Sequence, residues 1–224
     1  MLPTVEVRWF YKGDIPETTL QRFRSGELPQ DNEAAEERKD LYLYLPGYPR
    51  LGIKLRGTSI RRENGAEQLE IKRRLLEGGI VTFVPGVTGR LERWSKWAFH
   101  GEASGPQLST ILTAKDEAWV SVGKVRYMRR YKVTGDKKVL AVPLNDWPDN
   151  GCNVELTKVI VPGGQVWWTL GFEAFGESDL AIEANLMLTA NYFFAGTDMG
   201  MFEEKDSYGY PSWLNVVMAH EVKR

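Results

Sequence analysis

The stretches LGIKLR at residues 51–56 and LEIKRR at residues 69–74 alternate between apolar and polar residues. A period of two is typical of β-strands, because successive side chains of a strand point to opposite faces of its sheet. In the first stretch Lys54 and Arg56 share one face and Ile53 lies on the other. The pattern therefore predicts strands with one packed face and one basic face.

The same alternation recurs along most of the chain and predicts eight or nine strands. We expect them at residues 5–10, 41–45, 52–56, 69–75, 90–99, 119–132, 138–144, 154–161 and 166–175. Turn-forming pairs such as Gly78-Gly79 and Pro85-Gly86 separate neighbouring segments, which is typical of antiparallel hairpins. The sequence therefore favours a mainly β (α+β) fold built around an antiparallel barrel.

Two helices are predicted beside the strands. Asp14 can cap the first, which ends at Gly26. Ser178 can cap the second, which runs to about Phe194 and is apolar nearly all round, so we expect it to be buried against the barrel. Residues 27–39 are rich in Glu, Asp and Gln and are interpreted as a solvated loop or a frayed helix.

Composition is that of an ordinary globular protein, since 42% of the 224 residues are hydrophobic and 26% are charged. We expect one domain spanning residues 1–224. The 29 Lys and Arg nearly cancel the 30 Asp and Glu, so the chain as a whole lacks the basic character of a general nucleic-acid binder. Any anion site must therefore come from local sorting of charge.

Cys152 is the only cysteine, which rules out an internal disulfide and favours a cytoplasmic location. The first residues lack a long apolar run, and no later stretch reaches the roughly 18 apolar residues of a membrane span. We therefore expect neither a signal peptide nor a membrane partner.

Basic residues gather on one face of several predicted strands. The stripes are Lys54 with Arg56; Glu70, Lys72 and Arg74; Arg90, Glu92 and Lys96; and Lys124, Arg126, Arg130 and Lys132. On any single strand such a stripe is most simply interpreted as the solvent-exposed face of a sheet. Here four strands carry such a stripe, and the predicted apolar helix could cover the outside of a barrel. Together these features favour a position of the basic stripes inside the barrel. Enclosed cations need an anionic partner, so the pattern predicts an anion site.

Three glutamates lie among these stripes. Glu6 alternates with Arg8 on the first strand, Glu155 lies two residues before Thr157, and Glu173 is on the last strand. Carboxylate oxygens are natural ligands of Mg²⁺ and Mn²⁺, which usually bridge a few such groups to substrate phosphates. Each of these glutamates taken alone could equally be a surface residue.

The order of these segments resembles the CYTH superfamily, the triphosphate tunnel metalloenzymes, which include class IV adenylate cyclases, thiamine triphosphatases and inorganic triphosphatases. The resemblance covers residues 4 to about 180. The matching stretches are residues 4–8 for the ExExK strand, 51–56 for LRxR, 69–74 for the next basic strand, 89–93 for RxE, 124–130 for the later basic strand, and 153–158 and 170–175 for the closing ELD and ExE hairpin.

The resemblance implies a closed eight-stranded tunnel, flanked by helices, that binds and hydrolyses a triphosphate compound. The phosphate binders it implies are Arg8, Lys54, Arg56, Lys72, Arg74, Arg90, Lys124, Arg126 and Arg130. It implies Mg²⁺ or Mn²⁺ as cofactor, held by Glu6, Glu155 and Glu173, with Glu70 and Glu92 as further site residues. The partner would be a small phosphorylated molecule such as inorganic triphosphate, thiamine triphosphate or a nucleotide.

Thr4, Thr157 and Gly171 stand at three positions where the family pattern has an acidic residue. The sequence therefore supports anion binding better than catalysis, and it leaves open whether the chain is a triphosphatase. It also leaves open the organic part of the substrate and the oligomeric state. Residues 196–211 are interpreted as inert packing, a lid over one mouth of the barrel or a partner surface.

Two other binding functions fit the sequence. A lipocalin-like barrel would place its apolar face inward around an apolar ligand. A single-stranded nucleic-acid binder would use Trp94, Trp97, Trp167 and Trp168 as stacking platforms beside its basic residues, although Trp residues in a barrel are more often packed.

Several enzyme classes find no support in the sequence. No GxGxxG follows a predicted strand, and Val125 stands where a Walker loop needs Ser or Thr. Cys152, His100 and His220 offer too few soft ligands for zinc, and two histidines alone do not support a catalytic triad.

Overall fold

The computed structural model describes residues 2–25, 35–56, 67–100 and 118–221. Its strands are β1 (Leu2–Lys12), β2 (Glu36–Leu43), β3 (Leu51–Arg56), β4 (Gln68–Val84), β5 (Val87–His100), β6 (Trp119–Val133), β7 (Val139–Val142), β8 (Gly151–Ile160) and β9 (Val166–Phe175). Its α-helices are α1 (Glu17–Arg24), α3 (Asp179–Gly196) and α4 (Tyr210–Glu221), with short 3₁₀ turns at Pro162–Gly164 and Glu204–Asp206.

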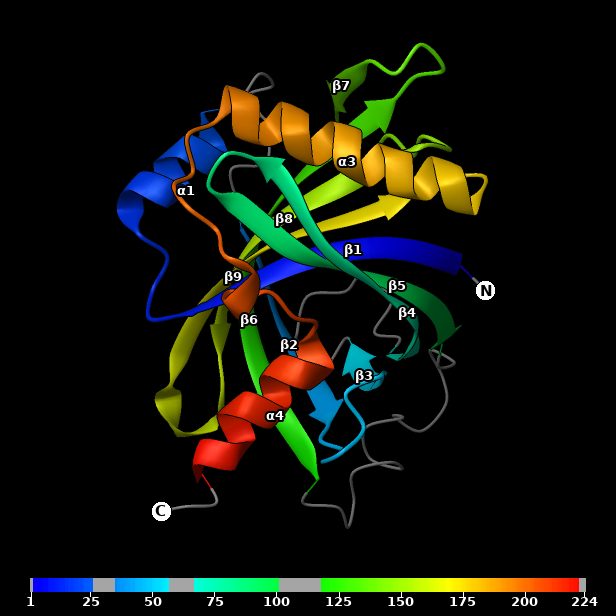
Figure 1. Ribbon diagram of the computed structural model, residues 1–224. Helices are drawn as coiled ribbons and strands as arrows, with labels where there is room; N and C mark the ends of the chain where they lie inside the picture. Colours follow the sequence, from blue (N-terminus) through cyan, green and yellow to red (C-terminus); the bar gives the residue numbers. More distant parts are fainter. Residues whose placement is uncertain (1, 26–34, 57–66, 101–117, 222–224) are drawn as a thin grey trace.

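The strands form a closed antiparallel barrel (Figure 1). Hydrogen-bonded neighbours follow the order β2-β3-β4-β5-β1-β9-β8-β6, and β6 pairs with β2 to close the ring. β7 pairs with β6 outside this ring. The prediction of a closed eight-stranded barrel with flanking helices is therefore confirmed.

The hairpin of β4 and β5 is longer than the sequence predicted. Gly78-Gly79 was expected to form a turn, but β4 continues through this pair with register shifts on both sides, and Gly79 adopts a positive φ of 85°. The reversal comes at Pro85-Gly86 instead, where Gly86 also has a positive φ. Glycine tolerates such φ values, so a Gly-Gly pair can form a bulge inside a strand as well as a turn.

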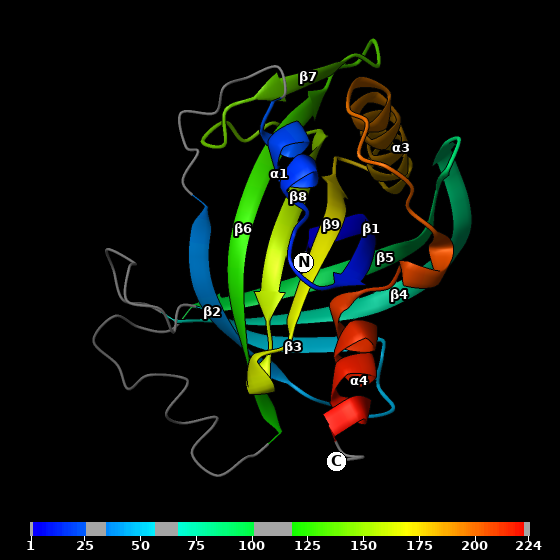
Figure 2. The same cartoon turned by 90° about the vertical axis from the view of Figure 1, so that its left-hand side faces the viewer.

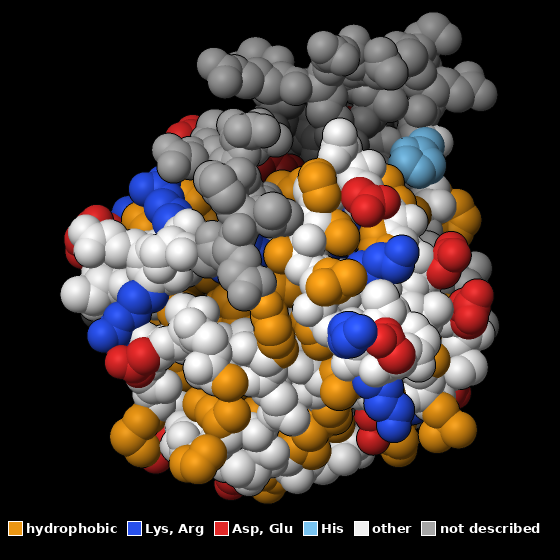
Figure 3. Space-filling model, turned by 90° about the horizontal axis from the view of Figure 1, so that it is seen from above, with side chains coloured by type: hydrophobic (Ala, Val, Ile, Leu, Met, Phe, Trp, Pro, Cys, Tyr) orange, Lys and Arg blue, Asp and Glu red, His pale blue; other side chains and the backbone are white. Residues whose placement is uncertain are grey.

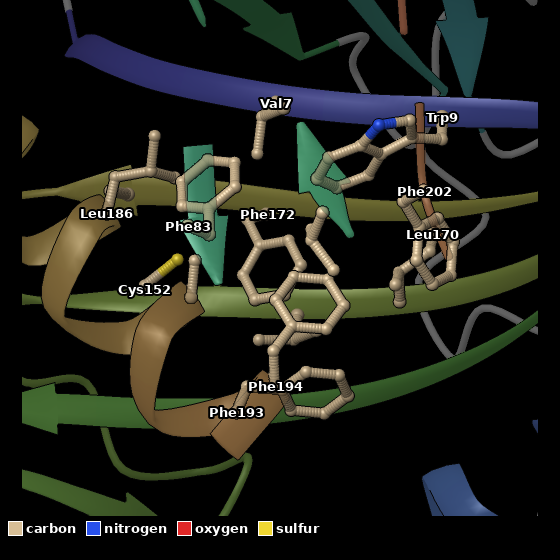
Figure 4. Close-up of a cluster of buried hydrophobic side chains, with 14 of the residues drawn as sticks. Val7, Trp9, Phe83, Cys152, Leu170, Phe172, Leu186, Phe193, Phe194 and Phe202 are labelled. Carbon is tan, nitrogen blue, oxygen red and sulfur yellow. The ribbon is translucent and has the colours of Figure 1, made fainter. Parts of the chain in front are cut away.

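The main hydrophobic core lies outside the barrel, between its wall and α3. The outward-facing side chains of β1, β8 and β9 meet α3 there, and Phe83 of the long hairpin closes the cluster (Figure 4). Trp9 of β1 is fully buried and contacts Phe83, Phe172 and Phe194 edge to face. Because α3 covers the outer face, as Figure 1 shows, the polar face of these strands is left for the interior.

A second apolar cluster fills one end of the barrel. Trp213, Leu214 and Val217 of α4 pack on inward-facing residues of β1, β2, β6 and β8, among them Phe10, which stacks on Trp213. Figure 2 shows α4 beside β3 at the lower end of the barrel. The barrel is therefore plugged at this end, and the helix that plugs it was not predicted.

Two local expectations are corrected by the structure. The residue that precedes α1 is Pro16, with no side-chain cap, while the Asp14 carboxylate accepts a hydrogen bond from the N–H of Ile15. Of residues 27–39, those from 36 onward belong to strand β2 rather than to a loop, and residues 27–34 lie outside the described residues. The Ser178 cap is confirmed, because its hydroxyl accepts from the N–H of Ala181.

Neither basic nor acidic side chains dominate the described outer surface over α3 and β7. In the space-filling view of Figure 3, basic and acidic side chains lie interspersed over the described part of this face. None of the helices in the described ranges is both long and apolar enough to cross a membrane.

Candidate functional site

The barrel encloses two adjoining cavities. The inner cavity, of about 60 Å³, lies next to the plugged end. The outer cavity, of about 910 Å³, opens at the other mouth. Both have Arg56, Glu155 and Glu173 in their walls, so the two cavities meet at these residues.

Charged side chains line the inner cavity. The cations are Arg8, Arg38, Lys54, Arg56, Lys72 and Lys124, and the carboxylates are Glu6, Glu70, Glu155 and Glu173. They come from seven of the eight strands of the ring, because each strand turns alternate residues inward. The basic stripes seen in the sequence therefore converge on an enclosed space.

Glu70 of β4 is surrounded by three cations. Its Oε1 lies 2.6 Å from Lys54 Nζ, and its Oε2 lies 3.1 Å from Lys96 Nζ and 3.5 Å from Arg56 Nε. The side chain is 1% exposed. Burial alone would raise its pKa, but Lys54 and Arg56 hold it well below the usual range, so Glu70 is an anion inside the lumen.

Lys72, also on β4, bridges two carboxylates from other strands. Its Nζ lies 2.5 Å from Glu6 Oε1 and 3.4 Å from Glu173 Oε1. Glu6 and Glu173 are register partners on the neighbouring strands β1 and β9. Burial would lower the pKa of Lys72, but the charges of Glu173 and Glu6 raise it above its ordinary value, so the ammonium is charged.

Glu155 of β8 is held by two arginines. Its Oε2 accepts from Arg8 Nη2 at 3.0 Å, and its Oε1 accepts from Arg126 Nη1 at 2.7 Å. The Arg8 guanidinium lies directly over Gly171, where a Cβ would stand 2.4 Å from Arg8 Cζ. Glycine at this position therefore leaves the room that Arg8 occupies.

A cluster missed by the sequence analysis borders the plugged end. Asp40 is fully buried, and its Oδ2 lies 3.1 Å from Lys124 Nζ and 3.4 Å from Arg38 Nε. Lys124 donates to the Tyr42 hydroxyl at 2.6 Å and lies 4.1 Å from the ring centre of Tyr210. Burial lowers the pKa of Lys124 to about 7 despite the charge of Asp40.

Residues 36–40 are all charged and show no apolar–polar alternation, so the only signal for Arg38 and Asp40 was their position directly before the strand predicted at residues 41–45. Glu36, two residues before Arg38 on the same face, pairs with Arg126 at the outer cavity.

The remaining predicted residues do not line the inner cavity. Arg74 and Glu92 form a buried ion pair near Trp94 and line neither cavity. Arg130 lines the outer cavity, where it stacks on Trp147 at 3.7 Å and donates to the carbonyls of residues 144 and 146.

Arg90 is another predicted residue that the structure does not bring to the cavities. It lies on the extension of the β4–β5 hairpin and pairs with Glu77 at 3.0 Å. It lines neither cavity described above.

The predicted metal-binding carboxylates are held in ion pairs that do not fit the coordination of a divalent cation. Glu6 and Glu173 share Lys72, and Glu155 is taken by Arg8 and Arg126. Among the residues that the structure describes, no group of three or more His, Cys, Asp or Glu could hold a metal ion. The oxygen donors that Mg²⁺ or Mn²⁺ would use are thus already neutralised by side-chain cations.

The interior bears on the two alternative binding modes without deciding between them. Charged side chains line the inner cavity, whereas the outer cavity also has apolar walls, among them Met128 and Trp147. Of the tryptophans predicted as stacking platforms, Trp94 and Trp168 are buried, Trp167 packs against Trp213, and Trp97 is half-buried. Both alternatives stay predictions.

The chain forms a closed antiparallel barrel, which is the fold that the resemblance to the CYTH superfamily implies. Comparison with protein-family models and with curated proteins finds no match to the sequence.

Solved structures of the mimivirus capping enzyme triphosphatase are similar to this chain. The monoclinic structure matches 86% of this chain and 89% of its own, with a TM-score of 0.48 and 8% identity. The RNA triphosphatase domain of the trifunctional mimivirus mRNA capping enzyme gives the same coverage, with a TM-score of 0.43 and 9% identity.

Proposed function

We propose that the lumen binds a triphosphate or a similar oligophosphate. The observation that carries this proposal is the convergence of Arg and Lys side chains from several strands on two adjoining cavities inside the barrel. Phosphate oxygens are strong acceptors for such groups, and arginine forks match their geometry. A linear oligophosphate entering by the outer cavity would meet Arg126 and Arg56 first and Arg8 and Lys72 deeper in.

Hydrolysis of the bound triphosphate, assisted by Mg²⁺ or Mn²⁺, is the finer hypothesis that the sequence resemblance adds. The residues it would use are Glu6, Glu155 and Glu173, and their ion pairs with Lys72, Arg8 and Arg126 argue against a ready metal site. Binding is therefore the function we propose, and phosphate release is scored in the same experiment.

The test is calorimetric titration of the protein with inorganic triphosphate, thiamine triphosphate, nucleoside triphosphates and orthophosphate. Arg56→Ala removes a guanidinium from the wall that the two cavities share, and Arg126→Ala removes one from the outer cavity. Because hydrogen bonds to charged groups contribute about 1.5–3 kcal/mol, either substitution should weaken triphosphate binding about 10- to 100-fold. Arg90→Ala is the matched control, since Arg90 is outside both cavities, and its affinity should equal that of the wild type.

Equal effects of all three substitutions would place the binding site outside the lumen. The absence of binding by any of the oligophosphates to the wild-type protein would refute the proposed function. Phosphate release in the titrated samples would add turnover to binding.

A further inference from the structure

Two carboxylates stand opposite each other on neighbouring strands of the lumen wall. Glu6 of β1 and Glu173 of β9 are register partners, and like charges placed directly across a strand pair repel. The Lys72 ammonium comes from β4, which pairs with neither strand, and contacts both carboxylates at 2.5 and 3.4 Å. A side-chain cation therefore lies between two oxygen donors from separate strands, the position a bridging metal ion would take.

We propose that the Lys72 ammonium is a built-in cation that replaces a divalent metal, so that the lumen holds its oligophosphate without Mg²⁺ or Mn²⁺. This inference rests on the proposed function for its ligand. Its claim about the cation site can be measured on the protein alone.

The neighbouring positions point the same way. The Thr4 hydroxyl donates to Glu6 Oε1 at 2.9 Å, so it supports the carboxylate instead of adding a negative charge. At Gly171 the space over the backbone is filled by Arg8, which is paired with Glu155. Of two positions that could have carried further acidic ligands, one therefore has the hydroxyl of Thr4, and at the other the space is taken by the guanidinium of Arg8. Lys and Arg side chains thus balance the negative charge of the nearby glutamates.

Lys72 can serve the ligand as well as the carboxylates. An ammonium has three N–H donors, and the contacts to Glu6 and Glu173 account for two of them. The third is available to a phosphate oxygen in the inner cavity, which Lys72 lines. A divalent cation placed at the same carboxylates would meet the positive charge of Lys72 at close range.

The substitution Lys72→Met tests the cation site by a gain of function. It removes the ammonium and leaves Glu6 and Glu173 facing each other, so the variant should bind Mn²⁺ at least tenfold more tightly than the wild type, seen as Mn²⁺-dependent thermal stabilisation and by calorimetry. Lys54→Met is the matched control. It also removes one lumen lysine, but Lys54 pairs with Glu70, which keeps Arg56 and Lys96.

Triphosphate is then titrated into the wild-type protein in EDTA and in excess Mg²⁺. Affinity in EDTA should be at least equal to that in Mg²⁺. A Lys72→Gln variant, which keeps a polar side chain, serves if Lys72→Met fails to fold.

The outcomes separate the two hypotheses. Tight Mn²⁺ binding by the wild type, or equal Mn²⁺ binding by the Lys54 and Lys72 variants, would overturn the role of Lys72. Triphosphate binding that needs Mg²⁺ would overturn metal-free binding while leaving the proposed function intact. If no oligophosphate binds under either condition, the proposed function fails, and the Mn²⁺ titrations still decide whether Lys72 occupies a cation site.

Discussion

Replacing Glu70 by Gln should destabilise the empty protein and strengthen its binding of oligophosphate. Glu70 is 1% exposed and is the common partner of Lys54, Arg56 and Lys96. The substitution keeps the shape of the side chain but leaves three cations facing one another without their counter-ion. The carboxylate thus acts as an internal substitute for the anion that the lumen is proposed to bind.

The magnitude follows from the burial of the group. Removing one partner of a buried ion pair costs about 3–5 kcal/mol. Lys54, Arg56 and Lys96 are 12%, 19% and 21% exposed and keep some access to water, so we expect the lower end of this range. For a chain of this size each kcal/mol lowers Tm by about 2–4 °C, which gives a loss of roughly 6–12 °C.

The assay is thermal unfolding followed by circular dichroism, with and without inorganic triphosphate. The ligand should restore more stability to Glu70→Gln than to the wild type, because a ligand that binds only the folded state stabilises it in proportion to the logarithm of its affinity. Glu77→Gln is the control, since Glu77 also pairs with arginines but is half exposed, and it should change stability by less than about 1 kcal/mol. A Glu70→Gln protein as stable as the wild type, with unchanged triphosphate affinity, would refute the reasoning.

Two further predictions concern Lys124 and Gly171. Burial lowers the pKa of Lys124 to about 7 in the folded protein, so between pH 7 and about 10 the unfolded chain holds more protons and stability rises with pH, by at most about 1.4 kcal/mol per pH unit. Urea unfolding across this window should show that Lys124→Met removes this rise, and a pH-independent difference between the two proteins would contradict it. Gly171→Ala places a Cβ against the Arg8 guanidinium and should cost about 1–3 kcal/mol, whereas in an Arg8→Met background the same change should cost less. Additive losses in that double-mutant cycle would show that Arg8 does not set the requirement for glycine.

The barrel could be predicted because its strands repeat one simple pattern. Alternation fixes which residues share a face, and the apolar α3 indicated that the outer face was the packed one. The buried residues of α4 do follow a helical spacing, since Trp213, Leu214 and Val217 lie on one face. Helix α4 nevertheless escaped prediction, because Val216 and Ala219 add apolar residues away from that face and the first turn contains Pro211, which the sequence alone also allows in a loop.

The sequence predicted which face of the strands forms the site, but not how far along each strand the site extends. Arg90 has the same inward parity as Glu92, yet the β4–β5 hairpin runs beyond the barrel, so Arg90 meets Glu77 rather than the lumen. Alternation tells which face a residue occupies and cannot tell where along the strand the cavity ends. The pairing of Lys72 with Glu6 and Glu173 likewise joins strands that are not hydrogen-bonded neighbours, so no local sequence pattern predicts it.

If the lumen binds oligophosphates as proposed, its internal ion pairs would make it discriminate by the number of charges on the ligand. An orthophosphate that displaces one carboxylate from Arg126 or Arg56 would exchange one ion pair for another, so its net gain would be small. A chain of phosphates could contact cations on several strands while giving up its freedom of movement only once, as linked binding groups do in general. The contacts that pair the cations of the empty barrel would then favour oligophosphates over orthophosphate.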